Sequence, residues 1–452
     1  MGAGGAGMRR VPGVRWVNGD GGLDAAAVTA AFPGRYGLYL HVPFCERICP
    51  FCPYNKVPYR PERADAYFRA LRGEIAAYRS AGAGPFTSLY VGGGTPTLCL
   101  EALAEMLASV PVEGERAIEV LPAHATPAGV ARLREAGFDR VSLGVQSFDD
   151  RVLRHLGRAG SGDENRAALE ACRGRFACVD ADLIFDTAFE DPAVFPADVE
   201  ECCRLEVDQI STYPLMRFGY TPFGRAPHAP RLERDLLRRA FALAEGYGYR
   251  RASVWSLRRA GAPGFSSITR EFYLGLGAGA ATFTGSLYLV NHFSPERYVE
   301  AVAAGRLPVT RTARLAPRAA AAYYLFWQAY AGGFDPARAR ALFPEAGRLP
   351  GAVAGVGRAF RWLERDGGGV ALTRRGFDRY HGLERWVTYR FIEPLWEQMM
   401  AEHREEPAVA GGGQVKITLE VNAEAESYDD AVRRTVSENA TQLGFEQQAF
   451  EE

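Results

Sequence analysis

A repeated alternation of short apolar runs and amphipathic segments between residues 36 and 255 constrains the fold of this chain more than any other feature. Apolar runs of strand length, such as Tyr36–Val42 and Phe86–Val91, precede segments with apolar residues at helical spacing, such as the one that begins at Pro61. Each unit spans roughly 30 residues, the length of a βαβ unit, and repeated units of this kind require parallel strands with crossover helices. About six units fit, which predicts an α/β fold with a partial (β/α)6 TIM-type barrel over residues 36–255.

The remaining regions differ from this pattern in composition. Residues 1–35 are Gly-rich with little periodicity and predict a loose N-terminal arm. Residues 256–406 predict a mostly helical C-terminal domain, in which Gly369–Gly376 resembles the wing of a winged-helix unit. Segment 407–413 predicts a linker, and the acidic segment 414–452 predicts a short β-α-β tail. This tail is interpreted either as an addition without a part in the activity or as an edge strand that docks a protein partner.

The composition excludes several classes of protein. The formal net charge of −1 provides no global basic surface for nucleic acid. No run of about twenty apolar residues occurs, so we expect no membrane span. The small, flexible start Met1–Arg10 lacks the apolar core of a secretory signal. Apart from one group, the eight cysteines are scattered and form no disulfide framework, which predicts a reduced, cytoplasmic protein.

Three of the cysteines, Cys45, Cys49 and Cys52, have the spacing C-x3-C-x2-C. Zinc usually takes four nitrogen or sulfur ligands, and no second C-x2-C or H-x3-H pair follows this triplet. An odd, crowded triplet also suits a disulfide knot poorly. A [4Fe–4S] cluster normally takes four cysteines, so three would leave one iron open to a small molecule. The triplet therefore favours a [4Fe–4S] site over zinc and over structural cysteines.

The surrounding string YLHVPFCERICPFCPYN, residues 39–55, resembles the radical S-adenosylmethionine (SAM) superfamily. Within it, the string is similar to the HemN/HemW-like branch, which contains oxygen-independent coproporphyrinogen III oxidase, a related heme chaperone and the class C radical SAM methyltransferases. The resemblance extends over residues 36–400. It implies a [4Fe–4S] cluster whose open iron binds SAM, and whose electron cleaves the sulfonium C–S bond to give a 5′-deoxyadenosyl radical.

The resemblance also implies roles for residues that follow the predicted strands. The resemblance implies that the three cysteines are catalytic. Tyr39, just before them, matches a tyrosine that is associated with SAM in the family. A glycine motif matches the residues that hold the SAM amino group, and four polar residues match further contacts to SAM. The motif is Gly92, Gly93, Gly94 and Thr95, and the polar residues are Glu119, Gln146, Arg158 and Asp182. The structural alternatives are a glycine turn, a solvated rim carboxylate, a surface arginine and a strand-end cap.

Three details qualify this set of residues. The match at Glu119 is incomplete, because EVLP stands where the family usually has EANP. His41 is interpreted as a buried structural histidine, with a proton donor as the alternative. Asp180 is either a second acid near the SAM ribose or the cap of a strand end.

Two departures from the family pattern narrow the expected reaction. Coproporphyrinogen III oxidases have a fourth cysteine where this chain has Tyr54, and the heme chaperone has a His-containing heme motif where residues 264–273 contain no His. The sequence therefore favours class C methyl transfer, or related C–C bond formation, with a second SAM molecule. The expected substrate is a small molecule or a peptide-derived compound, and the expected electron donor is a reduced flavodoxin or ferredoxin. The alternatives are coproporphyrinogen III oxidation, heme carriage and a non-catalytic iron–sulfur carrier.

Overall fold

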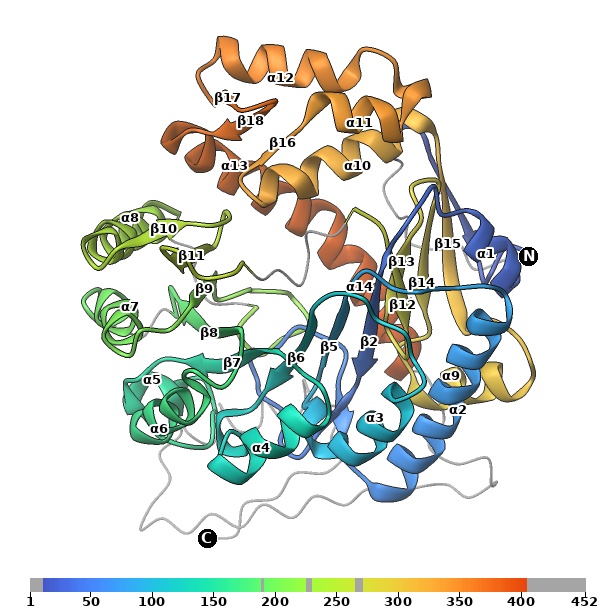
Figure 1. Cartoon of the computed structure of the whole chain (residues 1–452), viewed down its shortest axis with the longest axis horizontal. Helices are drawn as coiled ribbons and strands as arrows, with labels where there is room; N and C mark the ends of the chain where they lie inside the picture. Colours follow the sequence, from blue (N-terminus) through green and yellow to red (C-terminus); the bar gives the residue numbers. More distant parts are fainter. Residues whose placement is uncertain (1–10, 188–190, 225–229, 265–270, 405–452) are drawn as a thin grey trace, which may run out of the picture. The chain divides into compact units, whose positions relative to one another are not determined.

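The computed structural model describes residues 11–187, 191–224, 230–264 and 271–404 (Figure 1). The chain up to Glu405 forms one compact unit. The predicted linker 407–413 and tail 414–452 lie outside the described residues. Among the helices that are described, none is both long enough and apolar enough to cross a membrane.

Six parallel strands form the centre of the main sheet and follow one another in sequence order. They are β2 (Gly37–Val42), β5 (Leu89–Gly93), β6 (Arg116–Val120), β7 (Arg140–Gln146), β8 (Cys178–Phe185) and β9 (Gln209–Pro214). Helices connect them along one side of the sheet (Figure 1). These are α2 (Pro61–Ser80), α3 (Leu100–Leu107), α4 (Pro127–Glu135), α5 (Asp150–His155), α6 (Gly162–Cys172) and α7 (Val194–Arg204). The parallel order confirms the α/β arrangement predicted from the strand–helix alternation.

Side chains alternate between the two faces of each strand, and the two faces of the parallel region differ in chemistry. On the helix side they are apolar and join the main hydrophobic core, as Leu38 and Leu40 of β2 and Leu183 of β8 do. On the opposite face, here called the inner face, β8 presents Asp180 and Asp182, which alternate with core residues. The inner face is therefore where polar chemistry is available.

The sheet continues beyond the parallel strands to thirteen strands in all. At one edge, β9 is followed by β11 (Ser256–Arg259) and β10 (Tyr249–Arg251), which come after α8 (Pro230–Gly246). At the other edge, β12 (Tyr273–Leu276) pairs with β2 in parallel, and antiparallel strands follow. These are β13 (Ala281–Phe283), β14 (Leu287–Asn291), β15 (Val309–Leu315) and β1 (Val14–Asn18), with α9 (Pro295–Ala303) between β14 and β15. The sequence predicts that residues 256–406 are mostly helical. The strands β11 to β15 occupy much of this region up to Leu315, so the prediction holds only from Pro317 onward.

The N-terminal arm also contains more regular structure than its composition predicts. Val14–Asn18 forms β1, which pairs with β15, and Asp24 caps the short helix α1 (Ala25–Ala30). A strand of five residues gives only a weak alternating pattern. The strand with which it pairs lies almost 300 residues later in the chain. Local sequence patterns cannot reveal such a pairing.

The C-terminal region has the element order of a winged-helix unit. It contains α10 (Pro317–Tyr330), β16 (Gly333–Phe334), α11 (Pro336–Leu342), α12 (Leu349–Ala359), β17 (Leu363–Asp366) and β18 (Gly369–Leu372). The hairpin β17–β18 stands in the place of the wing, and β18 also pairs with β16. The segment predicted as the wing, Gly369–Gly376, contains β18 but not β17 and ends in the first turn of α13. The chain continues through α13 (Arg374–Val387), a π-helical turn (Thr388–Ile392) and α14 (Glu393–Arg404). Figure 1 shows this winged unit above the main sheet, while α14 runs back along the sheet.

Candidate active site

The cysteine loop follows the carboxyl end of β2 and is closed by a short parallel pair, β3 (Phe44–Cys45) and β4 (Val57–Pro58). The backbone N–H of Tyr59 donates to the carbonyl of Cys45 at 2.8 Å, which fixes the base of the loop. All three cysteines of the loop are free thiols, with Cys45 buried and the other two partly buried. The carboxyl ends of parallel strands are the usual place for a site in such sheets.

The thiols have polar neighbours that suit bound thiolates. The Thr95 hydroxyl donates to Cys45 Sγ at 3.6 Å, and Arg158 Nη1 donates to Cys49 Sγ at 3.7 Å. Burial raises the pKa of Cys45 to about 11 and also raises that of Cys52, so the metal-free thiols keep their protons at neutral pH. Iron that binds these sulfur atoms therefore displaces protons.

The donor set fits a three-cysteine cluster. Within the described ranges, no group of three or more His, Cys, Asp or Glu side chains is arranged to hold a metal ion. In a [4Fe–4S] cluster, each cysteine binds a different iron, so the sulfur atoms need not converge on one point. The residues that would hold the cluster are Cys45, Cys49 and Cys52.

The glycine motif packs directly against the cysteine loop. Gly94 N–H donates to Val42 O at 2.8 Å, and Thr95 N–H donates to Phe44 O at 2.7 Å. A methyl group on Gly94 would lie 2.6 Å from the Phe44 carbonyl oxygen. Gly93 has φ +122°, which side chains rarely adopt. The glycines therefore have a structural role, because they let the glycine motif pack closely on the cysteine loop at the carboxyl edge of the sheet.

Glu119 is not the solvated rim residue of the structural alternative. Its Oε1 accepts from the Tyr90 hydroxyl at 2.5 Å, and its Oε2 accepts from Gly93 N–H at 3.0 Å. Burial raises its pKa. Tyr39 stacks on Tyr90 at 5.9 Å between ring centroids, which places the predicted Tyr39 in the same cluster. Sequence reasoning missed Tyr90, although its position two residues before Gly92 puts it on the same face of β5.

His41 has the structural role that the sequence favours. Its Nδ1 lies 2.7 Å from the Tyr39 hydroxyl, and its Nε2 lies 3.0 Å from the carbonyl oxygen of Asn55. Burial lowers its pKa to about 4, so the ring is neutral at physiological pH. The ring thus ties β2 to the far end of the cysteine loop.

Gln146 and Arg158 meet at the carboxyl end of β7. Gln146 has φ +70°, a left-handed conformation that is uncommon for a non-glycine residue. Arg158 Nη2 donates to the Gly144 carbonyl at 2.7 Å, while its Nη1 reaches Cys49. A methyl group on Gly144 would lie 2.9 Å from Gln146 Nε2. Gly144, a second residue that sequence reasoning missed, therefore leaves room for the Gln146 side chain.

Asp180 and Asp182 extend the polar surface across β8. Ser142 Oγ donates to Asp182 Oδ2 at 2.6 Å, and Ser211 Oγ donates to Asp180 Oδ2 at 2.7 Å. Burial, and next the neighbouring Asp180, raise the pKa of Asp182 well above its usual value. Asp180 Oδ1 is buried and has no hydrogen-bond partner among the described residues. Asp182 and Asp180 thus lie on the inner face with hydrogen bonds to β7 and β9 respectively, and the contact of Asp182 with SAM stays a prediction.

The mouth of the site is bordered by the segment after β9 and by the last helices. Arg217 Nη1 donates to Asp186 Oδ2 at 2.9 Å in an ion pair whose side chains are each 2% exposed. Asp186 has φ +56°, so the end of β8 is also left-handed. On α13, Arg385 pairs with the buried Glu233 of α8. The backbone N–H of Arg217 also donates to the Tyr389 hydroxyl at 3.2 Å, so the segment after β9 contacts the turn that follows α13.

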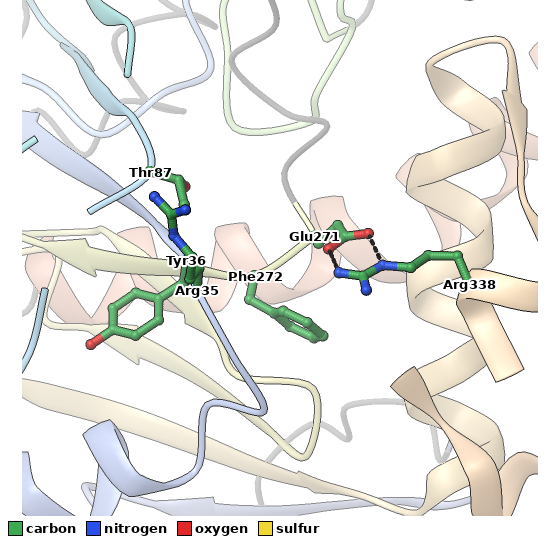
Figure 2. Close-up of a pocket in the computed structure, with 6 residues that line it drawn as sticks. All are labelled: Arg35, Tyr36, Thr87, Glu271, Phe272 and Arg338. Atoms are coloured by element: carbon green, nitrogen blue, oxygen red, sulfur yellow. Dashed lines mark hydrogen bonds and ion pairs between the residues drawn. The ribbon is translucent and has the colours of Figure 1, made fainter. Parts of the chain in front are cut away.

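A cavity of about 610 Å³ lies elsewhere, at the amino edge of the sheet (Figure 2). Tyr36, Thr87 and Phe272, which line it, precede β2, β5 and β12. Arg338 donates two hydrogen bonds to the Glu271 carboxylate, as the dashed lines in Figure 2 show. The cavity lining contains none of the predicted site residues, so this cavity is separate from the candidate active site.

Comparison with known proteins supports this arrangement. Residues 39–188 match the family model of the radical SAM superfamily. The chain is 33% identical over 310 residues to the heme chaperone HemW of Mycobacterium tuberculosis (strain ATCC 25618 / H37Rv), covering 62% of this chain and 78% of that protein. It is 28% identical over 403 residues to the oxygen-independent coproporphyrinogen III oxidase of Cereibacter sphaeroides, covering 77% of this chain and 87% of the relative.

A solved structure shows the same fold. Coproporphyrinogen III oxidase (HemN) from Escherichia coli, described as a radical SAM enzyme, aligns with a TM-score of 0.67 at 22% identity, over 79% of this chain and 91% of that one. Radical SAM proteins use a [4Fe–4S] cluster and SAM, the cofactors that the cysteine loop and its neighbours fit. The chain belongs to the radical SAM superfamily, in the group that includes HemW and oxygen-independent coproporphyrinogen III oxidase.

Proposed function

We propose that this chain cleaves SAM reductively and uses the resulting radical to remove hydrogen from a tetrapyrrole precursor of the coproporphyrinogen type. The observation that carries the first part is the free three-cysteine loop, with Thr95 and Arg158 donating to its sulfur atoms. The substrate class rests on the names of the relatives, coproporphyrinogen III oxidase and heme chaperone. When bound, the cluster supplies the electron that breaks the sulfonium C–S bond of SAM.

The proposed residue roles follow from chemistry and position. Glu119 is the carboxylate nearest the glycine motif and would accept from the SAM amino group. Arg158 lies between Cys49 and Gly144, where its guanidinium would face the SAM carboxylate. Asp182 and Gln146 would bind the ribose and orient the nucleoside. Tyr39, stacked behind Glu119 on Tyr90, would hold that carboxylate in place.

Anaerobic reconstitution with iron and sulfide, followed by dithionite and SAM, tests the first part of the proposal. Wild-type protein should release 5′-deoxyadenosine, and Cys49→Ala should lose both this product and the visible absorbance of the cluster. Retained turnover in Cys49→Ala would contradict the assignment. Added coproporphyrinogen III should be decarboxylated when a one-electron acceptor is also supplied, because the substrate radical forms the vinyl group by losing CO2 and one electron. Formation of 5′-deoxyadenosine without decarboxylation under these conditions would reject the substrate class alone. No 5′-deoxyadenosine from a SAM-bound cluster would favour a carrier.

Methyl transfer with a second SAM is the second candidate, favoured by the groups around the inner face. Tyr54 stands where the oxidases have a fourth cysteine. Burial raises the pKa of Glu384 to about 7, so this group is partly ionised at neutral pH and able to attract a sulfonium. S-adenosylhomocysteine formed together with 5′-deoxyadenosine would support methyl transfer, and its absence with every tested substrate would count against it. Hemin titration separately tests heme carriage.

Two partner assignments also belong to this proposal. The reductant in the cell would be a reduced flavodoxin or ferredoxin, because the chemistry consumes a low-potential electron. Replacing dithionite with reduced flavodoxin should therefore sustain 5′-deoxyadenosine release. Docking of a protein partner by the tail 414–452 is tested by a chain that ends at residue 406, which should keep turnover with dithionite and lose it only with the physiological donor.

A further inference from the structure

Tyr54 lies two residues after Cys52 and keeps much of its ring open. The ring is 45% exposed. The next residue, Asn55, has its carbonyl oxygen 3.0 Å from His41 Nε2, and His41 Nδ1 lies 2.7 Å from the Tyr39 hydroxyl. Tyr54 is therefore a partly exposed ring in the loop that connects the cysteines to the Tyr39 side of the candidate SAM site.

Trp396 of α14 supplies a second ring at the same place. Its ring centroid lies 5.6 Å from that of Tyr54, with the planes tilted by 58°. Trp396 also meets Phe218 edge-on at 6.1 Å. The two rings of Tyr54 and Trp396 come from opposite ends of the folded unit, so the tertiary structure alone brings them together.

The segment after β9 fixes both rings. Gly219 N–H donates to Glu393 Oε1 at 2.6 Å, which pins the start of α14. The hydroxyl of Tyr220 donates to the Pro53 carbonyl at 3.1 Å, which pins the cysteine loop next to Tyr54. Two neighbouring residues, Gly219 and Tyr220, therefore bind both α14 and the cysteine loop. These two hydrogen bonds fix the distance between the Tyr54 and Trp396 rings.

We propose that Tyr54 and Trp396 form an aromatic wall that holds a planar, unsaturated ring of the substrate beside the SAM site. This rests on the proposed radical SAM function and adds the substrate class that the mouth of the site accepts. Aromatic rings stack offset or edge-to-face on one another, and each pyrrole ring of a coproporphyrinogen-type substrate is planar although the macrocycle as a whole is not. The wall also explains why this chain has Tyr54 at the position where related oxidases have a fourth cysteine. Tyr54 supplies a ring surface at this position, whereas a cysteine would supply a sulfur atom.

Ligand binding with matched variants tests the wall. The probes are coproporphyrin III and the smaller aromatic 1-anilinonaphthalene-8-sulfonate, followed by fluorescence on reconstituted full-length protein. Tyr54→Leu and Trp396→Leu should each weaken binding of at least one probe about three- to tenfold, while Tyr54→Phe should bind as wild type does. Trp386→Leu is the control, because Trp386 on α13 is 56% exposed but contacts Phe391 instead of Tyr54.

The outcomes separate this proposal from the function on which it rests. Release of 5′-deoxyadenosine without substrate should stay within about twofold of wild type in every variant that folds, because neither ring is among the predicted SAM contacts. Binding of only the smaller probe would keep the wall and reject the flat, fully conjugated porphyrin as its ligand. Unchanged affinity in both leucine variants, an equal loss in Trp386→Leu, or no binding of either probe by wild type would overturn the wall. If Trp396→Leu does not fold, the test uses two other variants. Trp396→Phe should then bind the probes as wild type does, and Tyr54→Leu should still bind them more weakly; any other result would overturn the wall.

Discussion

Replacement of Glu119 by Gln probes the SAM site with the smallest change of shape. Both carboxylate oxygens accept hydrogen bonds, from the Tyr90 hydroxyl and from Gly93 N–H. An amide keeps one acceptor and removes the charge. A hydrogen bond to a charged group contributes about 1.5–3 kcal/mol, so loss of the bond to the SAM ammonium should weaken SAM binding roughly 10- to 150-fold.

The raised pKa of Glu119 also predicts how SAM affinity and stability change with pH. Burial raises the pKa of Glu119, so the folded protein keeps its proton to higher pH than the unfolded chain does. SAM affinity of the wild type should therefore fall as pH drops through this raised pKa, and Glu119→Gln should lack the dependence. The free energy of unfolding behaves in the opposite way: this group's contribution decreases as pH rises from the ordinary carboxyl pKa to the raised one, because the folded state binds more protons there.

Anaerobic calorimetry with SAM, combined with iron content and thermal unfolding, checks this reasoning. Glu101→Gln is the matched control, since its side chain is 72% exposed on α3 and pairs only with Arg132. Wild-type SAM affinity in Glu119→Gln at neutral pH would refute the assigned contact. A weaker affinity with an equal loss of iron would show that Glu119 acts through the glycine motif and the cysteine loop instead.

Three further changes test other parts of the structure. Gly94→Ala places a methyl group 2.6 Å from the Phe44 carbonyl oxygen, so the cysteine loop must shift; we expect most of the reconstituted iron to be lost, and full iron content would contradict this. Arg217→Met leaves Asp186 buried without its cation and should cost about 3–5 kcal/mol of unfolding free energy in urea titrations; an unchanged midpoint would argue against the buried pair. Burial raises the pKa of Glu74 to about 7, so its contribution to stability should fall as pH rises from about 5 to about 7, and Glu74→Gln should remove that slope from the unfolding temperature.

Local patterns predict the parallel region well because each unit depends on neighbouring residues. The alternation of strands and helices gave the order β2 to β9, and the motif after each strand fell at the carboxyl edge. The edge strands were not foreseen, because β1 pairs with β15 and β12 with β2 across most of the chain. The run Tyr273–Ala280 has the glycine content of a turn, yet its first half forms β12.

The predicted site residues divide in a similar way. The cysteines, the glycines and Arg158 meet in contacts between loops that the motifs identify. Tyr90 acts on Glu119 through a hydrogen bond between neighbouring strands, and Gly144 acts on Gln146 through the space that it leaves on the same strand, so no local motif marks either residue. Their positions on the inner face are the available signal, since both alternate with core residues of their strands.

The register of the sheet holds the polar groups of the candidate site on one face. Glu119 is the cross-strand neighbour of Ser142, and Ser142 is the neighbour of Asp180. A slip of one residue would turn these groups toward the helices, so the apolar outer face fixes the SAM-side geometry whatever the substrate is. Substrate choice must then come from residues outside the register. Tyr54 in the cysteine loop and Trp396 on α14 are such residues, since neither belongs to a strand of the main sheet.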